Sequence, residues 1–215
     1  MKTRLISLLL AFSMALTFLP VGAVSAFAAE TGSNELDLTP NTEFTITETA
    51  TYDLLPSKNA QGHLVIDAPG SIVTLNLKGS IKTNVLTTNF VEVKQGTLVF
   101  NGDNYKIEYQ STSPQTLSLV HVDTGATALV NEGTFITVAS PSPKAKGTFW
   151  ADGNLTLTKC TSTSDHASAV YNGSSGITTI DSCVFSSVDA DVIVNKGNLN
   201  IDCLLYTSPS PRDRS

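Results

Sequence analysis

Short stretches of alternating hydrophobic and polar residues run through most of this chain, and glycine-containing turns separate them. Five stretches combine an apolar strand, a turn that ends in glycine, and a second strand close to G-x-L-x-L; they cover residues 91–100, 128–138, 148–157, 169–180 and 192–201. Alternation places every second side chain on the same face of a strand. The pattern therefore predicts short β-strands that each bury one face.

The glycines of these stretches recur at a nearly constant spacing. Gly133, Gly153, Gly176 and Gly197 are 20, 23 and 21 residues apart. A period of this length indicates stacked repeat units, in which each strand pairs with the equivalent strand of the neighbouring units. We therefore expect an all-β parallel β-helix (β-solenoid) over residues 57–202, preceded by a strand or cap region at residues 30–56. A two-sheet β-sandwich is the alternative.

Side chains at fixed offsets from the glycines should form ladders inside the solenoid. Leu155 and Leu199 each lie two residues after a glycine, and Cys160 and Cys183 each lie seven residues after one. We expect the two cysteines to be consecutive steps of one buried ladder, packed as small hydrophobic side chains. A disulfide between them is the alternative.

The glycines are expected to supply turns with positive φ, because Asn or Asp often stands beside them and both residue types tolerate that conformation. The spacing is less regular upstream. The 37 residues between Gly96 and Gly133 fit either two coils or one coil that carries a loop.

Three phrases carry a resemblance to a known family: V-T-L-N-L-K-G from Val73, A-V-Y-N-G-S-S-G-I-T-T-I-D-S-C-V-F from Ala169, and V-I-V-N-K-G-N-L-N-I-D from Val192. They resemble coils of right-handed parallel β-helix proteins, the pectate-lyase-like superfamily, as found in secreted and surface proteins of Gram-positive bacteria. The resemblance covers about residues 36–202. It implies a right-handed coil and leaves the function open, since that superfamily includes polysaccharide lyases, hydrolases, adhesins and structural spikes.

The two ends of the chain are expected to lie outside the mature fold. Residues 1–29 combine Lys2 and Arg4 with an apolar run and an A-x-A site, which is typical of a secretory signal peptide and predicts an extracellular or cell-wall location. Residues 203–213 read C-L-L-Y-T-S-P-S-P-R-D and resemble a translated transposase sequencing adapter. We therefore expect residues 203–215 to be a non-native tail and the natural protein to continue beyond Asp202, so that the solenoid is truncated at its C-terminal end.

Charge narrows the range of partners. Residues 30–202 contain nine lysines, no arginine and 18 acidic residues, a formal net charge of −9. Such acidity argues against nucleic-acid binding, which needs basic patches. We also expect no membrane span in the mature chain. The two cysteines of this segment are too few for a disulfide framework.

Aromatic residues offer the strongest signal for ligand binding. Trp150 and Tyr171 occupy the same offset in consecutive coils, and outward aromatic ladders bind sugars. Equating these positions with Val93, Val130 and Val194 instead predicts that Trp150 and Tyr171 point inward and that Phe149 is the outward ring. All three remain candidate ligand-binding residues.

Metal-binding and catalytic signals are weaker. Asp189 and Asp191, two residues apart, could hold Ca²⁺ or flank a glycosidic oxygen, although an acidic turn explains them equally. Lyases of the superfamily use Arg or Lys as a base with Ca²⁺, and here Lys159 is expected near Asp181 of the next coil as a solvated pair. We assign no catalytic residue and no cofactor beyond this possible Ca²⁺.

These features favour a secreted or wall-associated module that recognises or displays extracellular polysaccharides or host glycans, as the N-terminal part of a longer protein. A polysaccharide lyase or glycoside hydrolase with its catalytic coils beyond Asp202 is a second hypothesis. A passive spacer is the third.

Overall fold

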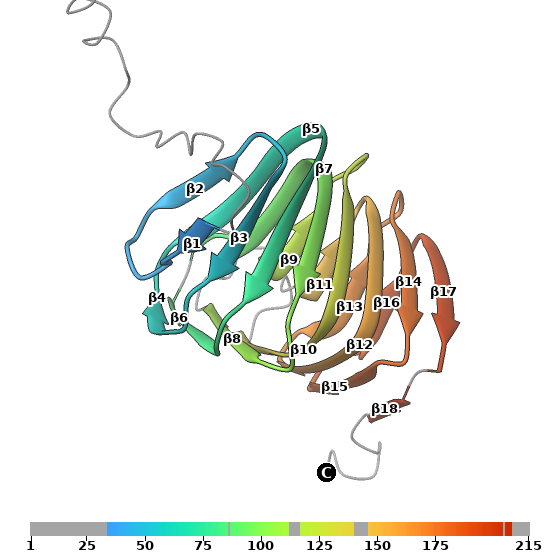
Figure 1. The fold of residues 1–215 in the computed structure, drawn as a ribbon. Helices are drawn as coiled ribbons and strands as arrows, with labels where there is room; N and C mark the ends of the chain where they lie inside the picture. The colour runs from blue at the N-terminus through green and yellow to red at the C-terminus, as the bar shows by residue number, and fades with distance from the viewer. Residues whose placement is uncertain (1–33, 86, 112–116, 140–145, 204, 208–215) are drawn as a thin grey trace, which may run out of the picture.

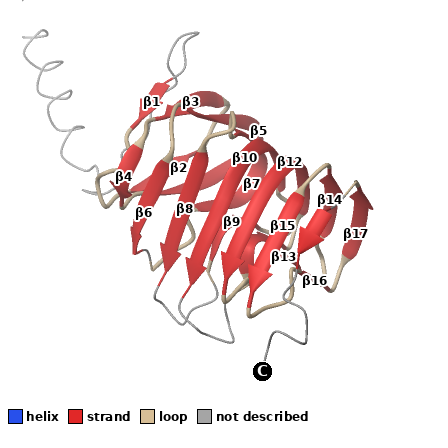
Figure 2. Ribbon diagram, turned by 90° about the horizontal axis from the view of Figure 1, so that it is seen from below, coloured by secondary structure: helices blue, strands red, loops and turns tan. Residues whose placement is uncertain are grey.

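The computed structural model describes residues 34–85, 87–111, 117–139, 146–203 and 205–207, and none of these residues is helical (Figures 1 and 2). They form eighteen strands: β1 (Asn34–Leu36), β2 (Glu43–Ile46), β3 (Ala50–Leu54), β4 (Ser57–Ala60), β5 (His63–Leu77), β6 (Ile81–Val85), β7 (Val91–Asn101), β8 (Lys106–Ser111), β9 (Ser118–Val122), β10 (Thr127–Ala139), β11 (Gly147–Ala151), β12 (Asn154–Asp165), β13 (Ser168–Asn172), β14 (Ile177–Asp181), β15 (Val184–Val188), β16 (Ile193–Asn195), β17 (Asn198–Asp202) and β18 (Leu205–Thr207).

The strands build a parallel β-solenoid of about six turns, which confirms the predicted fold class. Strands of successive turns pair in parallel along three faces. Face A holds β2, the first parts of β5 and β7, and then β9, β11, β13 and β16. Face B continues from β3 through the second parts of β5 and β7 and the first parts of β10 and β12 to β14 and β17. Face C runs from β4 to β18.

Equivalent residues of successive turns form continuous columns inside the solenoid. One column on face B consists of Val73, Leu98, Ala128, Leu155, Thr178 and Leu199. Leu155 is fully buried, and Leu199 packs against the core from the last turn, as the alternation predicted. Because parallel pairing stacks like side chains at about 4.8 Å, each column buries apolar area that a single turn could not bury alone.

The cysteines occupy adjacent steps of such a column. Cys160 and Cys183 are both buried, and both thiols are free, so the predicted ladder is confirmed and the disulfide alternative is not what the structure contains. The Cys160 backbone N–H donates to the Cys183 sulfur over 3.3 Å. The neighbouring Cys183 side chain and burial both raise the pKa of the Cys160 thiol, which keeps it neutral in the core.

The glycine column differs from the expected one in register, and the positive φ expected of these glycines is found at Gly96 and Gly133 but not at Gly153. Gly153 and Gly176 align with Ala126 and Gly96, whereas Gly133 pairs with Cys160 on a different part of the turn. The interval from Gly96 to the equivalent residue Ala126 is therefore a single coil. A Cβ atom at Gly153 would overlap the carbonyl oxygen of Asp123 in the preceding turn. Close approach of two backbones, rather than positive φ, requires glycine there.

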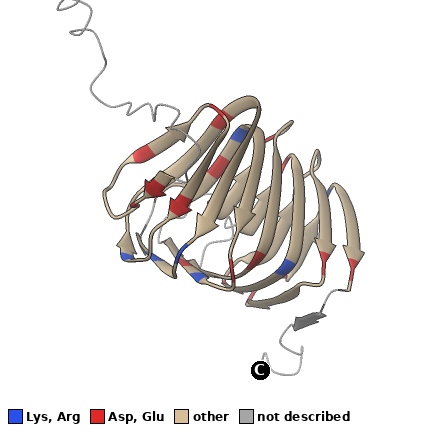
Figure 3. Ribbon diagram, in the orientation of Figure 1, with Lys and Arg blue, Asp and Glu red and all other residues tan. Residues whose placement is uncertain are grey.

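An outer ladder of amide side chains follows the end of face B. Asn131 donates to Asn101 over 3.2 Å, Asn101 donates to Asn76 over 2.9 Å, and Asn76 donates to Asp53 over 3.0 Å. Figure 3 shows acidic residues at the carboxyl ends of β3, β14 and β17, which belong to the same column. The ladder joins four consecutive turns where the chain leaves the sheet.

The signal peptide predicted at residues 1–29 lies outside the described residues, as do residues 204 and 208–215 of the expected tail. In the part of the chain that the structure describes, no helix has the length and apolar character needed to cross a membrane. The strands at residues 43–54 pair with β5, so this predicted entry region is continuous with the solenoid.

Candidate functional site

One outward column on face A contains a carboxylate, an imidazole and two aromatic rings in successive turns. Strand pairing aligns Glu92 of β7 with His121 of β9, Trp150 of β11, Tyr171 of β13 and Val194 of β16. The adjacent inward column consists of Val91, Val120, Phe149, Val170 and Ile193. Along four turns the outward side chain therefore changes from a carboxylate to an imidazole and then to two aromatic rings.

The predicted orientation of the aromatic residues is wrong, although their alignment in consecutive turns is confirmed. Phe149 is 0% exposed and contacts Phe135 edge-on at 5.1 Å between ring centroids, so it is the core residue. Trp150 and Tyr171 point outward and are half-buried. The error came from equating Trp150 with Val93. Strand pairing aligns Val93 with Val122, and Val122 with Ala151, which is one residue after Trp150. A shift of one residue exchanges the two faces of a strand.

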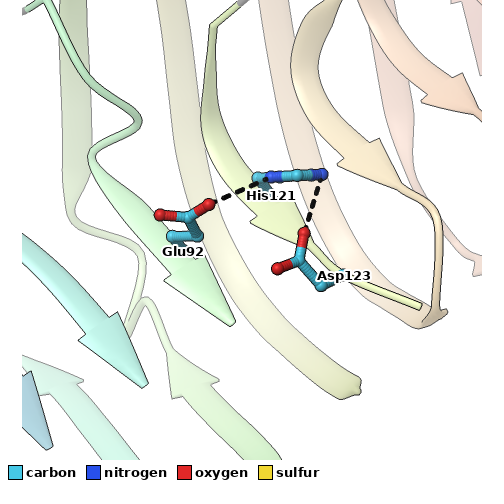
Figure 4. A group of neighbouring side chains, drawn as sticks. All are labelled: Glu92, His121 and Asp123. Atoms are coloured by element: carbon cyan, nitrogen blue, oxygen red, sulfur yellow. Dashed lines mark ion pairs between the residues drawn. The ribbon is translucent and has the colours of Figure 1, made fainter. Parts of the chain in front are cut away.

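His121 lies at the centre of the acidic end of this column, surrounded by carboxylates (Figure 4). Its Nδ1 is 3.7 Å from Glu92 Oε1, and its Nε2 is 3.4 Å from Asp123 Oδ1 and 3.5 Å from Asp152 Oδ2. The imidazole side chain is only 9% exposed. We call Glu92, His121, Asp123 and Asp152 the His121 cluster.

The indole of Trp150 fixes the plane of the imidazole. The rings of His121 and Trp150 stack at 3.8 Å between centroids with 23° between their planes. Asn89 Nδ2 lies 3.5 Å from the His121 Nδ1. These contacts hold the ring in one plane, so that each nitrogen faces its own set of carboxylates.

The other end of the column carries two lysines. Lys146 Nζ is 4.0 Å from the ring centroid of Tyr171 and 5.3 Å from that of Trp150, and Lys196 Nζ is 5.2 Å from the Tyr171 centroid. Lys196, and then Lys146, lower the pKa of the Tyr171 hydroxyl by favouring the phenolate. The Trp150 and Tyr171 rings are 6.4 Å apart and nearly perpendicular at 86°. They present an edge and a face rather than one flat platform.

An open groove of about 730 Å³ runs beside the His121 cluster. It is lined by the turns that follow the strands of face A, including Lys94, Thr124 and Gly125, and by the carboxylates Asp123 and Asp152. Glu92 and His121 are not among its lining residues. The Nε2 side of the imidazole therefore faces the carboxylates that border open space, and the Nδ1 side faces Glu92.

The acidic residues selected from the sequence lie elsewhere. Asp189 is exposed at φ 61°, and its Oδ2 is 3.5 Å from His166 Nδ1; Asp191 is also exposed. Among the described residues, the side chains that could share a metal ion are instead Glu92, His121 and Asp123. Ca²⁺ binding by Asp189 and Asp191 stays a prediction. Lys159 pairs with Glu132 at 3.5 Å, in the preceding turn, rather than with Asp181.

Sequence reasoning missed the His121 cluster. His121 and Asp123 are two residues apart on one strand and its turn, a spacing that puts both side chains on one face, and this signal was available. The contribution of Asp152 was not visible, since it lies 31 residues away and depends on the exact coil length.

Comparison with protein-family models gives no match, and comparisons with curated proteins and with solved structures give no significant match either. The site is therefore interpreted from its own geometry.

Proposed function

We propose that this chain is an exported recognition module that binds acidic glycans along the outer side of face A. The observation that carries the proposal is the group formed by Trp150, Tyr171 and Lys146, in which an ammonium lies 4.0 Å from one ring centroid and 5.3 Å from the other. The faces of aromatic rings bind the apolar faces of sugars, and ammonium groups bind their carboxylate or sulfate substituents. The solenoid places Trp150 and Tyr171 in consecutive turns, so neighbouring sugar units of a polymer could contact both.

Local charge favours an acidic ligand over a neutral one. Residues 30–202 as a whole carry a formal charge of −9, yet the ammonium groups of Lys146 and Lys196 lie 4.0 and 5.2 Å from the Tyr171 ring centroid. A local cationic group on an acidic protein attracts an anion at close range, whereas the rest of the acidic surface repels polyanions. The bound segment would therefore be short and centred on β11 and β13.

The predicted leader and the wall or extracellular location agree with this role, because acidic polysaccharides are abundant outside cells. We propose display at a bacterial surface as the setting. No catalytic group is assigned to the bound glycan, so the proposed role is binding without turnover.

The test is affinity electrophoresis of the full chain in gels that contain hyaluronan, polygalacturonate or neutral dextran. Retardation is expected in the two acidic polymers and absent in dextran. Tyr171→Ala and Lys146→Met should each weaken retardation at least tenfold. The matched control is Tyr105→Ala, because Tyr105 is also a surface tyrosine, 40% exposed, on another part of the solenoid.

Equal retardation of wild type and Tyr171→Ala would contradict the proposal. Release of unsaturated uronates from polygalacturonate in the presence of Ca²⁺ would replace it with the lyase hypothesis.

A further inference from the structure

We propose that the His121 cluster is a binding site for a divalent transition-metal ion of the zinc class. Glu92, His121 and Asp123 would supply the ligands, because one ligand atom from each lies within 4.8 Å of the others, and Asp152 would add a further carboxylate beside the imidazole. Its ligands are not members of the aromatic and lysine group, although Trp150 contacts both sites, so metal binding and glycan binding are tested by different variants.

The distances around Nε2 fit a metal ion better than direct ion pairs. Charge-assisted hydrogen bonds between an imidazolium and a carboxylate are about 2.7–2.9 Å long. The observed separations from Nε2 are 3.4 Å to Asp123 Oδ1 and 3.5 Å to Asp152 Oδ2. Ligands bound about 2.0–2.2 Å from a tetrahedral Zn²⁺ lie about 3.3–3.6 Å from one another. The two separations from Nε2 fall in that range, and the ligand atoms of Glu92, His121 and Asp123 lie within 4.8 Å of one another.

The second nitrogen, Nδ1, has two polar neighbours. Glu92 Oε1 lies 3.7 Å from Nδ1 (Figure 4), and Asn89 Nδ2 lies 3.5 Å from the same nitrogen. Glu92 is therefore close enough to share an ion with the imidazole. The stacked Trp150 ring, 3.8 Å away, restricts rotation of the imidazole.

Charge and access also support a cation. Three carboxylates surround one imidazole that is 9% exposed, so the cluster is acidic even when the imidazole is protonated. Asp123 and Asp152 border the open groove of about 730 Å³, which provides an entry path. An imidazole ligand favours Zn²⁺ and similar ions over Ca²⁺ and Mg²⁺, which prefer shells made of oxygen alone.

The single tryptophan of the chain gives a direct readout, because Trp150 stacks on the proposed ligand. Co²⁺, a coloured substitute for Zn²⁺, should quench its fluorescence on binding, and Zn²⁺ should compete with that quenching. Isothermal titration calorimetry of the full chain with Zn²⁺ should give one site. His121→Gln, Asp123→Asn and Glu92→Gln should each weaken that site at least tenfold, because each removes a ligand.

The matched controls are His63→Gln and His166→Gln, since each of these histidines also lies beside a carboxylate, at 3.1 Å from Glu43 and 3.5 Å from Asp165. Both controls should keep full Zn²⁺ affinity and full Co²⁺ quenching. Circular dichroism identifies any variant that fails to fold, in which case Asp152→Asn replaces it. Absence of Zn²⁺ binding, binding that survives His121→Gln, loss of binding in a control, or stronger binding of Ca²⁺ than of Zn²⁺ would each overturn the proposal.

Discussion

Trp150 and His121 occupy the same outward position in consecutive turns, and their rings stack at 3.8 Å with only 23° between the planes. The contact places the indole between an acidic imidazole cluster on one side and the Tyr171 and lysine group on the other. It also means that each ring shields the other from water. The two candidate sites are therefore neighbours along one column, with Trp150 contacting both.

Phe149 and Trp150 should differ sharply in their contribution to stability, although they are adjacent. Phe149→Ala opens a cavity beside Phe135 and should lower the free energy of unfolding by about 3–5 kcal/mol. Trp150→Ala removes a half-buried surface ring and should cost clearly less. Urea denaturation followed by circular dichroism measures both values. Equal losses, or a larger loss for Trp150→Ala, would contradict the orientation found here.

Two buried serines of β12 provide a matched test of hydrogen bonding in the core. Ser162 Oγ is buried with no hydrogen-bond partner, whereas Ser164 Oγ lies 2.7 Å from Thr148 Oγ1 and donates to the Ser168 carbonyl over 3.0 Å. An unsatisfied buried hydroxyl costs about 1–3 kcal/mol, so Ser162→Ala should leave stability unchanged or raise it. Ser164→Ala should lower the free energy of unfolding by about 1–2 kcal/mol.

Thermal or urea unfolding of the two alanine variants gives the comparison directly. Each variant is the control for the other, because the serines are two residues apart on the same inward face. A loss of stability in Ser162→Ala as large as that in Ser164→Ala would show that Ser162 has a partner in solution.

Tyr171 should ionise at a lower pH than an ordinary tyrosine. Lys196 and Lys146 stabilise its phenolate and lower the pKa of the hydroxyl below the usual 10.0. Ionisation is then easier in the folded state, so the phenolate adds stability that is complete above the unfolded pKa and is lost as the pH falls through the folded pKa. The difference in absorbance at about 295 nm between wild type and Tyr171→Phe isolates this residue during a pH titration.

Lys196→Met and Lys146→Met should move the Tyr171 midpoint toward higher pH. Lys159→Met is the control, because Lys159 pairs with Glu132 instead. A midpoint at or above that of a free tyrosine in the wild type would show that the lysines do not approach the hydroxyl in solution.

The repeat could be predicted from sequence because alternation and cysteine spacing are local signals. Cys160 and Cys183 sit one coil apart in register, as their common offset from glycine indicated. The phase of the upstream copy could not be predicted, because Ala126 replaces glycine in that column. The turn that Gly133 seemed to mark lies between faces B and C, and successive coils carry Glu132, Lys159 and Ser182 there, which adopt positive φ although none is glycine. The presence or absence of glycine therefore did not distinguish this turn from the turn between faces A and B.

The His121 cluster shows a second limit of sequence reasoning. Its members come from three successive turns whose lengths differ, so a change of one residue in any turn would separate them. The strand that carries each residue could be identified from alternation. Their convergence depends on stacking that only the folded chain establishes.

The amide ladder that ends at Asp53 gives the solenoid a direction. Every side chain in it donates toward the N-terminal turn, and the last acceptor is an anion, which polarises the bonds before it. Loss of the anion at Asp53 would therefore weaken the bond from Asn76 first and, through it, the amide bonds of the two turns that follow.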